Sequence, residues 1–289
     1  YNNGDLIGVK GIEGGYEAKL RGEKGMGITL VDVHNRSQGK FNEGKFDTLP
    51  KTGKTLISTI DIKLQEYGEQ LMQNKIGAIV AIEPNSGEIL SLISAPTYNP
   101  NILSGRNRSK EYKNLIENKN KPLFNRALTG QYPPGSTFKL INGLISLEEK
   151  VISPMTIFSC DDGYEYEKDK KVGCHPHRQN LSLKSAIAIS CNSYFCKTFA
   201  EIFKKYDNTH QAYEVWRNHL QSFGIGDWMN NDFLTGAKGK LPKQEYYNNT
   251  YGKKYWNSST IISTAIGQGE LLLTPIQMAN ITCIIANRG

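Results

Sequence analysis

The chain has 289 residues, with 35 lysines and arginines against 28 aspartates and glutamates, which gives a formal net charge of +7. Apolar residues make up 38% and charged residues 22% of it, a composition that supports one large or two smaller folded domains and excludes a disordered or collagen-like chain. No uncharged apolar run reaches the roughly 18 residues of a membrane span, and no signal peptide opens the sequence.

The basic residues are spread along the chain and interleaved with acidic ones, as in the segment 165–171 (EYEKDKK). Nucleic-acid binding needs clustered lysines and arginines with stacking aromatic side chains. We therefore expect no nucleic-acid partner and a mildly basic solvated surface, with an anionic surface as the alternative partner.

Residues 1–50 are rich in glycine and charge, and their apolar pattern is short. Residues 11–22 favour a short helical stretch mixed with turns, and the alternation in 27–33 (GITLVDV) favours a strand. We expect an extended segment without its own core. The turn-forming residues Pro50 to Gly53 mark the boundary, so that 51–289 form the second domain.

The second domain begins with Asp61, a residue type that caps helices, ahead of apolar residues at helical spacing up to Leu71. Residues 76–82 and 88–94 predict a β-hairpin, and 97–125, rich in asparagine and lysine, predict a surface loop. Helices are expected over 137–147, 183–206 and 275–286. These elements predict an α+β fold with helices packed on an antiparallel sheet.

Ser136 and Lys139 stand three residues apart at the start of an apolar helix, behind the rigid turn Pro133-Pro134-Gly135. The spacing places both side chains on one face and one turn. A serine hydroxyl becomes a nucleophile when a neighbouring base takes its proton, and a lysine is such a base once burial lowers its pKa. Free N–H groups at the helix start would stabilise an oxyanion. A helix cap beside a solvated lysine is the alternative interpretation.

Ser190 and Asn192 lie within an apolar stretch that predicts a helix (AIAISCNSYF, 186–195). Both residue types are unfavourable inside a helix, because their side chains compete with the backbone for hydrogen bonds. A hydroxyl that relays a proton and an amide that holds the substrate or the lysine would explain their presence. The alternative is a polar kink satisfied within a buried helix.

Cysteines and histidines gather between these two motifs, and three thiolates with one imidazole would complete a tetrahedral zinc site: Cys160, Cys174, His177 and Cys191. His177 is preferred over His175 because Cys-x-x-His spacing lets both side chains turn to one point. A Cys160–Cys174 disulfide and free thiols are the alternatives. Cys196 and Cys283 are expected to be ordinary buried residues.

The motifs YPPGSTFKL and SCNSYF, in this order, resemble the first two motifs of the penicillin-binding transpeptidases. GIEGGYEAKLRGEKG resembles the head of the non-catalytic pedestal (dimerisation) domain of class B members. The segments ISTIDIKLQ, AIVAIEPNSGEILSLISAPTYNPN and AIGQGELLLTPIQMANITCIIANRG resemble the elongation-specific branch. The resemblance implies a penicillin-binding transpeptidase-like α+β domain behind an extended pedestal segment.

By this resemblance the chain is a peptidoglycan D,D-transpeptidase that forms a serine acyl-enzyme at D-Ala–D-Ala and is a target of β-lactams. Ser136 would be the nucleophile, Lys139 its base, Ser190 the proton relay, and Asn192 the residue that holds the peptide or the lysine. The alternatives are a β-lactamase or D,D-carboxypeptidase, which is a hydrolase, and a non-catalytic scaffold. No cofactor is needed for this chemistry, although relatives carry a metal-type cluster at the cysteine region, which supports structural zinc.

The resemblance also implies partners and a location: stem peptides of peptidoglycan, the shape-determining protein MreC and the glycosyltransferase RodA, at the inner membrane with the catalytic domain in the periplasm. A membrane anchor ahead of Tyr1 is implied. So is a third motif, Lys-Thr-Gly, after Gly289, which would supply part of the oxyanion hole. Lys51-Thr52-Gly53 spells that motif, but it precedes Ser136 and is given no catalytic role.

Overall fold

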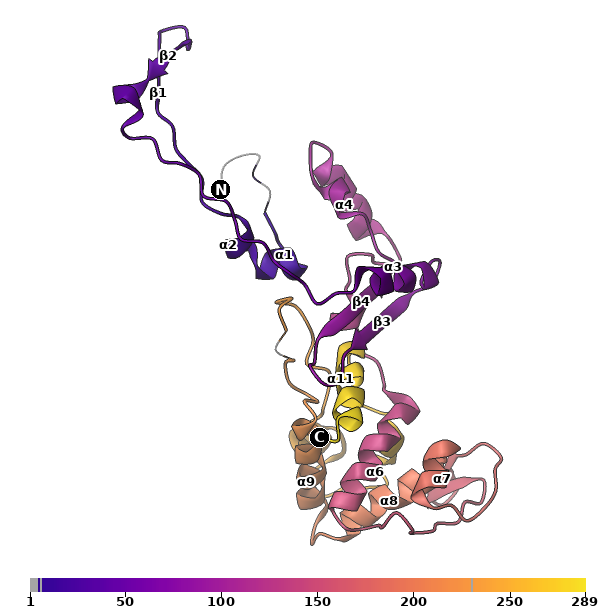
Figure 1. The fold of residues 1–289 in the computed structure, drawn as a ribbon. Helices are drawn as coiled ribbons and strands as arrows, with labels where there is room; N and C mark the ends of the chain where they lie inside the picture. The colour runs from indigo at the N-terminus through magenta and orange to yellow at the C-terminus, as the bar shows by residue number, and fades with distance from the viewer. Residues whose placement is uncertain (1–4, 6, 230) are drawn as a thin grey trace.

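Glycine-rich and charged residues at the start of the chain build a long arm that extends away from the rest of the molecule (Figure 1). The computed structural model describes residues 5, 7–229 and 231–289, so residues 1–4 and 6 of the predicted first domain lie outside the description. The arm contains these elements: α1 (Gly11–Gly15), α2 (Glu17–Leu20), β1 (Thr29–Val31), β2 (Ser37–Lys40) and the 3-10 helix η1 (Phe41–Gly44).

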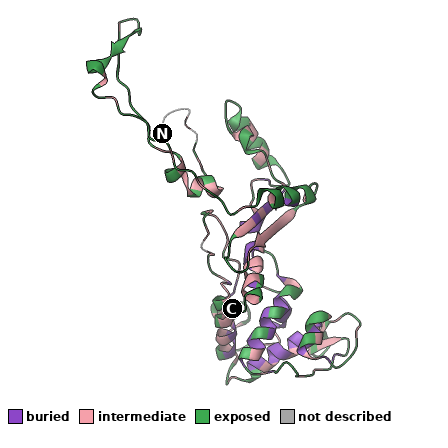
Figure 2. Ribbon diagram, viewed as in Figure 1, coloured by how far each residue is buried: buried purple, intermediate pink, exposed green. Residues whose placement is uncertain are grey.

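The two limbs of the arm are held together by backbone pairing and not by a core. β1 and β2 pair antiparallel at the tip, and bridges join Met26 to Thr48 and Glu23 to Lys51 on the way back. None of the described residues in these helices and strands is buried, and Figure 2 shows the tip of the arm as mostly exposed ribbon. The arm is therefore the extended segment without its own core that the sequence predicts.

A capped helix and a hairpin open the second part of the chain, as predicted. The Asp61 carboxylate accepts hydrogen bonds from the N–H groups of Lys63 and Leu64, which begins α3 (Ile62–Leu71). β3 (Gly77–Ile82) and β4 (Ile89–Ala95) pair antiparallel in the register Gly77 to Ala95. α3 packs on β4, and the last helix of the described chain packs on β3.

Residues 97–125 do not form only a surface loop, so this prediction is wrong in part. They contain η2 (Pro100–Leu103) and α4 (Arg108–Glu117), and α5 (Arg126–Thr129) follows. Tyr112, Leu115 and Ile116 stand at helical spacing in α4, a signal that the many asparagines and lysines of the segment conceal.

The remaining elements form the helical part that contains most of the buried side chains, drawn in purple in Figure 2. They are η3 (Gly135–Phe138), α6 (Lys139–Glu148), β5 (Gly163–Glu167), β6 (Lys170–Gly173), α7 (Leu183–Ala188), α8 (Asn192–Lys204), α9 (Thr209–Ser222), α10 (Gln244–Tyr251), η4 (Ile262–Ile266) and α11 (Pro275–Ala286).

α8 is the centre of this part. Nine of its 13 residues are buried, among them Phe195 and Phe199, and it packs against α6, α9, η4 and the β5–β6 hairpin. Phe199 meets Trp216 of α9 edge to face, with ring centroids 5.3 Å apart.

α11 has the predicted bounds and the predicted start, because the Thr274 hydroxyl accepts from the N–H of Gln277 and Pro275 occupies the first turn. The α+β fold is confirmed.

The predicted helix over 183–206 is wrong as a single helix, since it breaks between α7 and α8. Ser190 adopts the left-handed conformation, with φ of 54°, which ends the first helix. Cys191 then caps the second helix, and its sulfur accepts from the N–H of Tyr194. Ser190 and Asn192 therefore occupy a helix junction and not a helix interior.

Within the described residues, no helix combines the length and the apolar character needed to cross a membrane.

Candidate active site

Ser136 lies on a tight turn whose position is fixed by a distant glycine. It belongs to η3, directly before α6, and its side chain is exposed. The N–H of Gly135 donates to the carbonyl of Gly267 at 2.8 Å. A Cβ added to Gly267 would lie 2.3 Å from the carbonyl oxygen of Gly135, and φ at Gly267 is 70°. Only a glycine at 267 permits this approach, so the AIGQG segment supports the serine turn.

Lys139 is three residues further on and is buried, with 2% of its surface exposed. Its ammonium nitrogen donates three hydrogen bonds: to the Ser190 carbonyl at 2.7 Å, to Ser190 Oγ at 2.9 Å and to Asn192 Oδ1 at 2.6 Å. The two predicted motifs therefore meet at Lys139. Among the described residues, Ser136 Oγ has no hydrogen-bond partner.

Burial lowers the pKa of Lys139, because the low-dielectric interior disfavours the charged form, and the nearby thiols of Cys174, Cys191 and Cys196 oppose this shift. A lysine with a lowered pKa is the kind of base that can accept the proton of a neighbouring serine. Lys139 is therefore the candidate base for Ser136, which stands three residues earlier in the chain.

The junction between α7 and α8 aims both of its polar side chains at Lys139. The left-handed backbone of Ser190 turns its carbonyl and its hydroxyl to the same ammonium group. The Asn192 amide is held from its other end, since Nδ2 donates to the Gly173 carbonyl at 2.8 Å. A left-handed non-glycine residue is strained, and such strain persists only where surrounding contacts fix it.

Asn142 is a supporting residue that the motifs did not indicate. It is fully buried on α6, donates to the Ala265 carbonyl at 2.7 Å and accepts from Trp216 Nε1 at 2.8 Å. These bonds fix α6, and with it Lys139, to η4 and α9. In the sequence, the only sign of this role is that Asn142 is a single amide side chain within the apolar run LINGLIS.

The four predicted metal ligands come together beside the second motif: their ligand atoms all lie within 4.8 Å of one another in the cluster of Cys160, Cys174, His177 and Cys191. Cys174 Sγ is 3.1 Å from His177 Nε2 and 3.9 Å from Cys191 Sγ. Such separations suit ligands arranged around one zinc ion with bonds of about 2.0–2.3 Å. All five cysteines of the chain are free thiols here, so Cys160 and Cys174 form no disulfide.

The surroundings of the cluster favour a metal ligand set. His177 Nδ1 lies 2.7 Å from the carbonyl of Arg178, which fixes the tautomer and leaves Nε2 to face Cys174. Burial raises the pKa of Cys174, but hydrogen bonds from His177 and from the N–H groups of Asn192 and Ser193 outweigh it and lower the pKa to about 7. The N–H of Asn192 donates to Cys174 Sγ at 3.3 Å, which connects the cluster to the second motif.

Comparisons with known proteins agree with this geometry. Residues 77–289 match the penicillin binding protein transpeptidase domain, and residues 1–58 match the penicillin-binding protein dimerisation domain. Because the first match covers well over half of the chain, the chain belongs to the penicillin-binding protein transpeptidase family, and the second match indicates class B. The predicted family is confirmed.

Particular relatives lie in one branch of that family. The peptidoglycan D,D-transpeptidase MrdA of Acinetobacter baumannii is 33% identical over 100% of this chain and 41% of its own length. The penicillin-binding protein PBP2 of Helicobacter pylori, solved in complex with MreC, is 30% identical with a TM-score of 0.82, over 98% of this chain and 50% of that one. A chain from a peptidoglycan synthase complex is 27% identical, with a TM-score of 0.82 over 100% of this chain and 51% of that one. This chain spans less than half the length of the first curated relatives that it matches.

Proposed function

We propose that the protein is a peptidoglycan D,D-transpeptidase that acts through a serine acyl-enzyme. The observation that carries the proposal is the contact of Lys139 with Ser190 and Asn192, one turn after the exposed hydroxyl of Ser136. The substrate class is the stem peptide ending in D-Ala–D-Ala, as the names of the relatives suggest. β-Lactams would acylate the same serine.

In the first step, the neutral amine of Lys139 takes the proton of Ser136 Oγ, and the oxygen attacks the carbonyl of the penultimate D-Ala. The N–H of Ser136 is a donor for the oxyanion that forms. When the C–N bond breaks, Ser190 passes a proton from Lys139 to the leaving amine, and D-Ala departs. An amine of a second stem peptide then attacks the ester and restores Ser136, with the protons returning along the same path.

The test is covalent labelling of the full-length protein with fluorescent penicillin. The wild type should form a stable adduct, and Ser136→Ala should lose it while keeping the wild-type unfolding temperature. Ser109→Ala, at an exposed serine of α4, is the control. Absence of an adduct on the wild type would refute the proposal. Rapid release of hydrolysed penicillin would instead identify a β-lactamase or carboxypeptidase-like hydrolase.

We also propose a structural zinc ion, held by Cys160, Cys174, His177 and Cys191. The four ligand atoms form a single group, and the set of three sulfurs and one nitrogen suits zinc. The ion would supply no step of the reaction. Its ligands would attach the loop after β6 to Cys191, the cap of the helix that carries Asn192.

Metal analysis of the purified protein tests the zinc site. We expect about one zinc per chain, and Cys174→Ser should lose the metal and lower the unfolding temperature. Cys283→Ser, a cysteine outside the cluster, should keep the metal. A metal-free protein with normal stability would contradict the site.

We propose further that the arm belongs to a pedestal domain that contacts MreC and RodA, with the catalytic part in the periplasm and an anchor in the inner membrane. The Helicobacter pylori relative in complex with MreC and the relative in a peptidoglycan synthase complex support this assembly. We place the domain boundary just after the predicted position at residue 50, because Lys51 and Lys54 still pair with the arm.

A further inference from the structure

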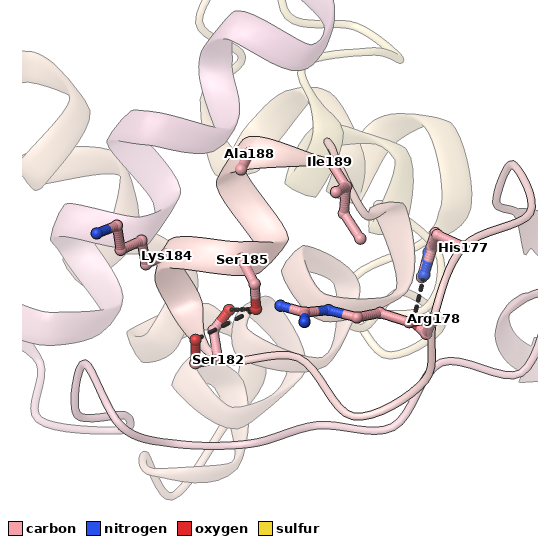
Figure 3. A pocket seen from close by; sticks show the side chains of 7 residues that line it. All are labelled: His177, Arg178, Ser182, Lys184, Ser185, Ala188 and Ile189. Carbon is pink, nitrogen blue, oxygen red and sulfur yellow. Dashed lines mark hydrogen bonds between the residues drawn. The ribbon is translucent and has the colours of Figure 1, made fainter.

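A pocket of about 390 Å³ lies at α7, the helix that directly precedes the second motif in the chain (Figure 3). Two cationic residues, two serines, a histidine and two apolar side chains line it: Arg178, Lys184, Ser182, Ser185, His177, Ala188 and Ile189. The mechanism proposed above uses neither the two cationic residues nor the two serines. The pocket therefore has a composition that calls for a ligand with both an anionic and an apolar part.

Its positive charge is not balanced by neighbouring acids. The sequence has no aspartate or glutamate from Lys170 to Ala200. Within the part of the chain that the structure describes, the side chains of Arg178 and Lys184 have no ion-pair or hydrogen-bond partner. Figure 3 shows the Arg178 side chain running across the pocket toward Ser185, while Lys184 lies at the far side of α7. An arginine in this position can bind a carboxylate with two parallel hydrogen bonds.

The serines add polar groups at the same place. The Ser185 hydroxyl donates to the carbonyl of Ser182 at 2.9 Å, and the two hydroxyl oxygens are 3.2 Å apart. The Ser182 hydroxyl can therefore turn from Ser185 to a bound oxygen. Ile189, half-buried, offers an apolar wall for the carbon chain of the ligand.

The pocket and the catalytic group are joined by neighbouring residues of the chain. Ile189 lines the pocket, and the hydroxyl of the next residue, Ser190, accepts a hydrogen bond from Lys139. In the proposed reaction Ser190 delivers the proton to the leaving amine. The attacking amine of the second step takes the position that the leaving amine vacated, because the second step is chemically the reverse of the first. The incoming peptide must therefore pass Ser190, next to the pocket.

We propose that this pocket binds a carboxylate of the acceptor stem peptide, through Arg178 with help from Ser182. The proposal rests on the proposed transpeptidase function. It names the site that would hold the second substrate, in the orientation that brings its amine to Ser190.

The test uses the full-length protein after acylation with penicillin, so that Ser136 is occupied and only the acceptor side is open. The probes are fluorescent alanyl-γ-glutamyl-lysine with free carboxylates and the same peptide with its carboxylates amidated. By fluorescence anisotropy, the free acid should bind roughly tenfold more tightly than the amide, the effect of a charge-assisted pair. Arg178→Gln should abolish this difference.

Arg108→Gln, on the distant helix α4, is the matched control and should keep the difference. Each variant is first checked for wild-type labelling by penicillin and a wild-type unfolding temperature. Equal binding of the two peptides by the wild type would overturn the proposal, and so would a tenfold difference that survives in Arg178→Gln. Displacement of the acid peptide by equimolar inorganic phosphate would mean an unselective anion site, which also overturns it. Failure of penicillin to label the wild type is a different result, since it refutes the transpeptidase function itself.

Discussion

Lys139 is the residue whose protonation state should control the reaction of Ser136. Its burial lowers its pKa, so the neutral amine becomes available below the pH of about 10.4 at which a lysine in water loses its proton. We predict that the rate of acylation by penicillin rises with pH, with an apparent pKa below that value. Stopped-flow measurement of the adduct on the full-length protein gives this profile.

Lys139→Arg tests the same role as general base, because a guanidinium keeps the positive charge but cannot give up its proton. The rate should fall by about 10²–10⁴-fold, the usual contribution of a general base. Lys204→Arg, an exposed residue paired with Glu201, should leave the rate unchanged. A pH-independent rate, or a normal rate in Lys139→Arg, would show that another group activates the serine.

Gly267 makes no chemical contribution of its own, but it sets the position of the serine turn. A methyl group there would lie 2.3 Å from the Gly135 carbonyl oxygen. We predict that Gly267→Ala lowers the rate of penicillin acylation by at least tenfold, because the turn that carries Ser136 must move. Gly87→Ala is the control, since Gly87 has a similar φ of 76° and open space around its Cβ position. If the two variants acylate equally fast, the contact does not position the serine.

At the scale of elements, Glu149 joins the ends of three helices. It follows α6, and its carboxylate accepts from Lys205 at 2.6 Å and from Tyr206, both just after α8, and from His219 of α9 at 2.6 Å. Burial raises the pKa of Glu149, but the three donors outweigh it and lower the pKa to about 2. This carboxylate should stabilise the fold while it is ionised.

The sign of the pH dependence follows from the lowered pKa. The stabilisation is complete above the ordinary glutamate value of about 4.3 and is lost as the pH falls toward 2, with a magnitude of roughly 3 kcal/mol. We predict that Glu149→Gln lowers the unfolding temperature at pH 7 and makes it less sensitive to acid between pH 5 and 3. Glu148→Gln, at an exposed neighbour, is the control for scanning calorimetry. An equal acid sensitivity in Glu149→Gln and wild type would contradict this role.

Elements with strong local signals could be predicted from the sequence, whereas those set by distant contacts could not. Asp61 and Thr274 cap their helices through nearby N–H groups, so their position in the sequence was sufficient. The break at Ser190 depends on Lys139, 51 residues earlier, which binds both polar groups of that residue. The apolar pattern of 183–206 continues across the junction, so the unfavourable residues Ser190 and Asn192 were the only local sign of the break.

The same distinction applies to the site. The residue types at Ser136, Lys139, Ser190 and Asn192 indicated the chemistry, and the structure brings the last three into hydrogen-bond contact. The role of Gly267 could not be inferred, because this role depends on a contact with Gly135, which is more than a hundred residues away in the chain.

Among the helices, α9 was missed although Tyr213, Trp216 and Leu220 stand at helical spacing after the cap Asn208.

At the scale of the whole molecule, the described part of the arm touches the catalytic part at the loop that contains Asp232. The Tyr16 hydroxyl donates a hydrogen bond to the Asp232 carboxylate. This bond is the main reason why the pKa of Tyr16 is raised. A Cβ added to Gly15 would lie 2.2 Å from the carbonyl oxygen of Asp232, so the two backbones are in close contact there. The loop then returns to the catalytic part, where the N–H of Ala237 donates to the Leu128 carbonyl of α5, ahead of Ser136.

This contact should restrict the angle between the arm and the catalytic part. We predict that Gly15→Ala and Tyr16→Phe each increase the hydrogen exchange of residues 231–237 in the full-length protein, because both remove support from the same loop. The exchange of α8 should stay unchanged, since its packing lies elsewhere. Tyr255→Phe, at an exposed tyrosine outside the contact, is the control. If neither variant changes exchange in the loop, the arm is held to the catalytic part by other contacts, and the angle between them does not depend on Tyr16 and Asp232.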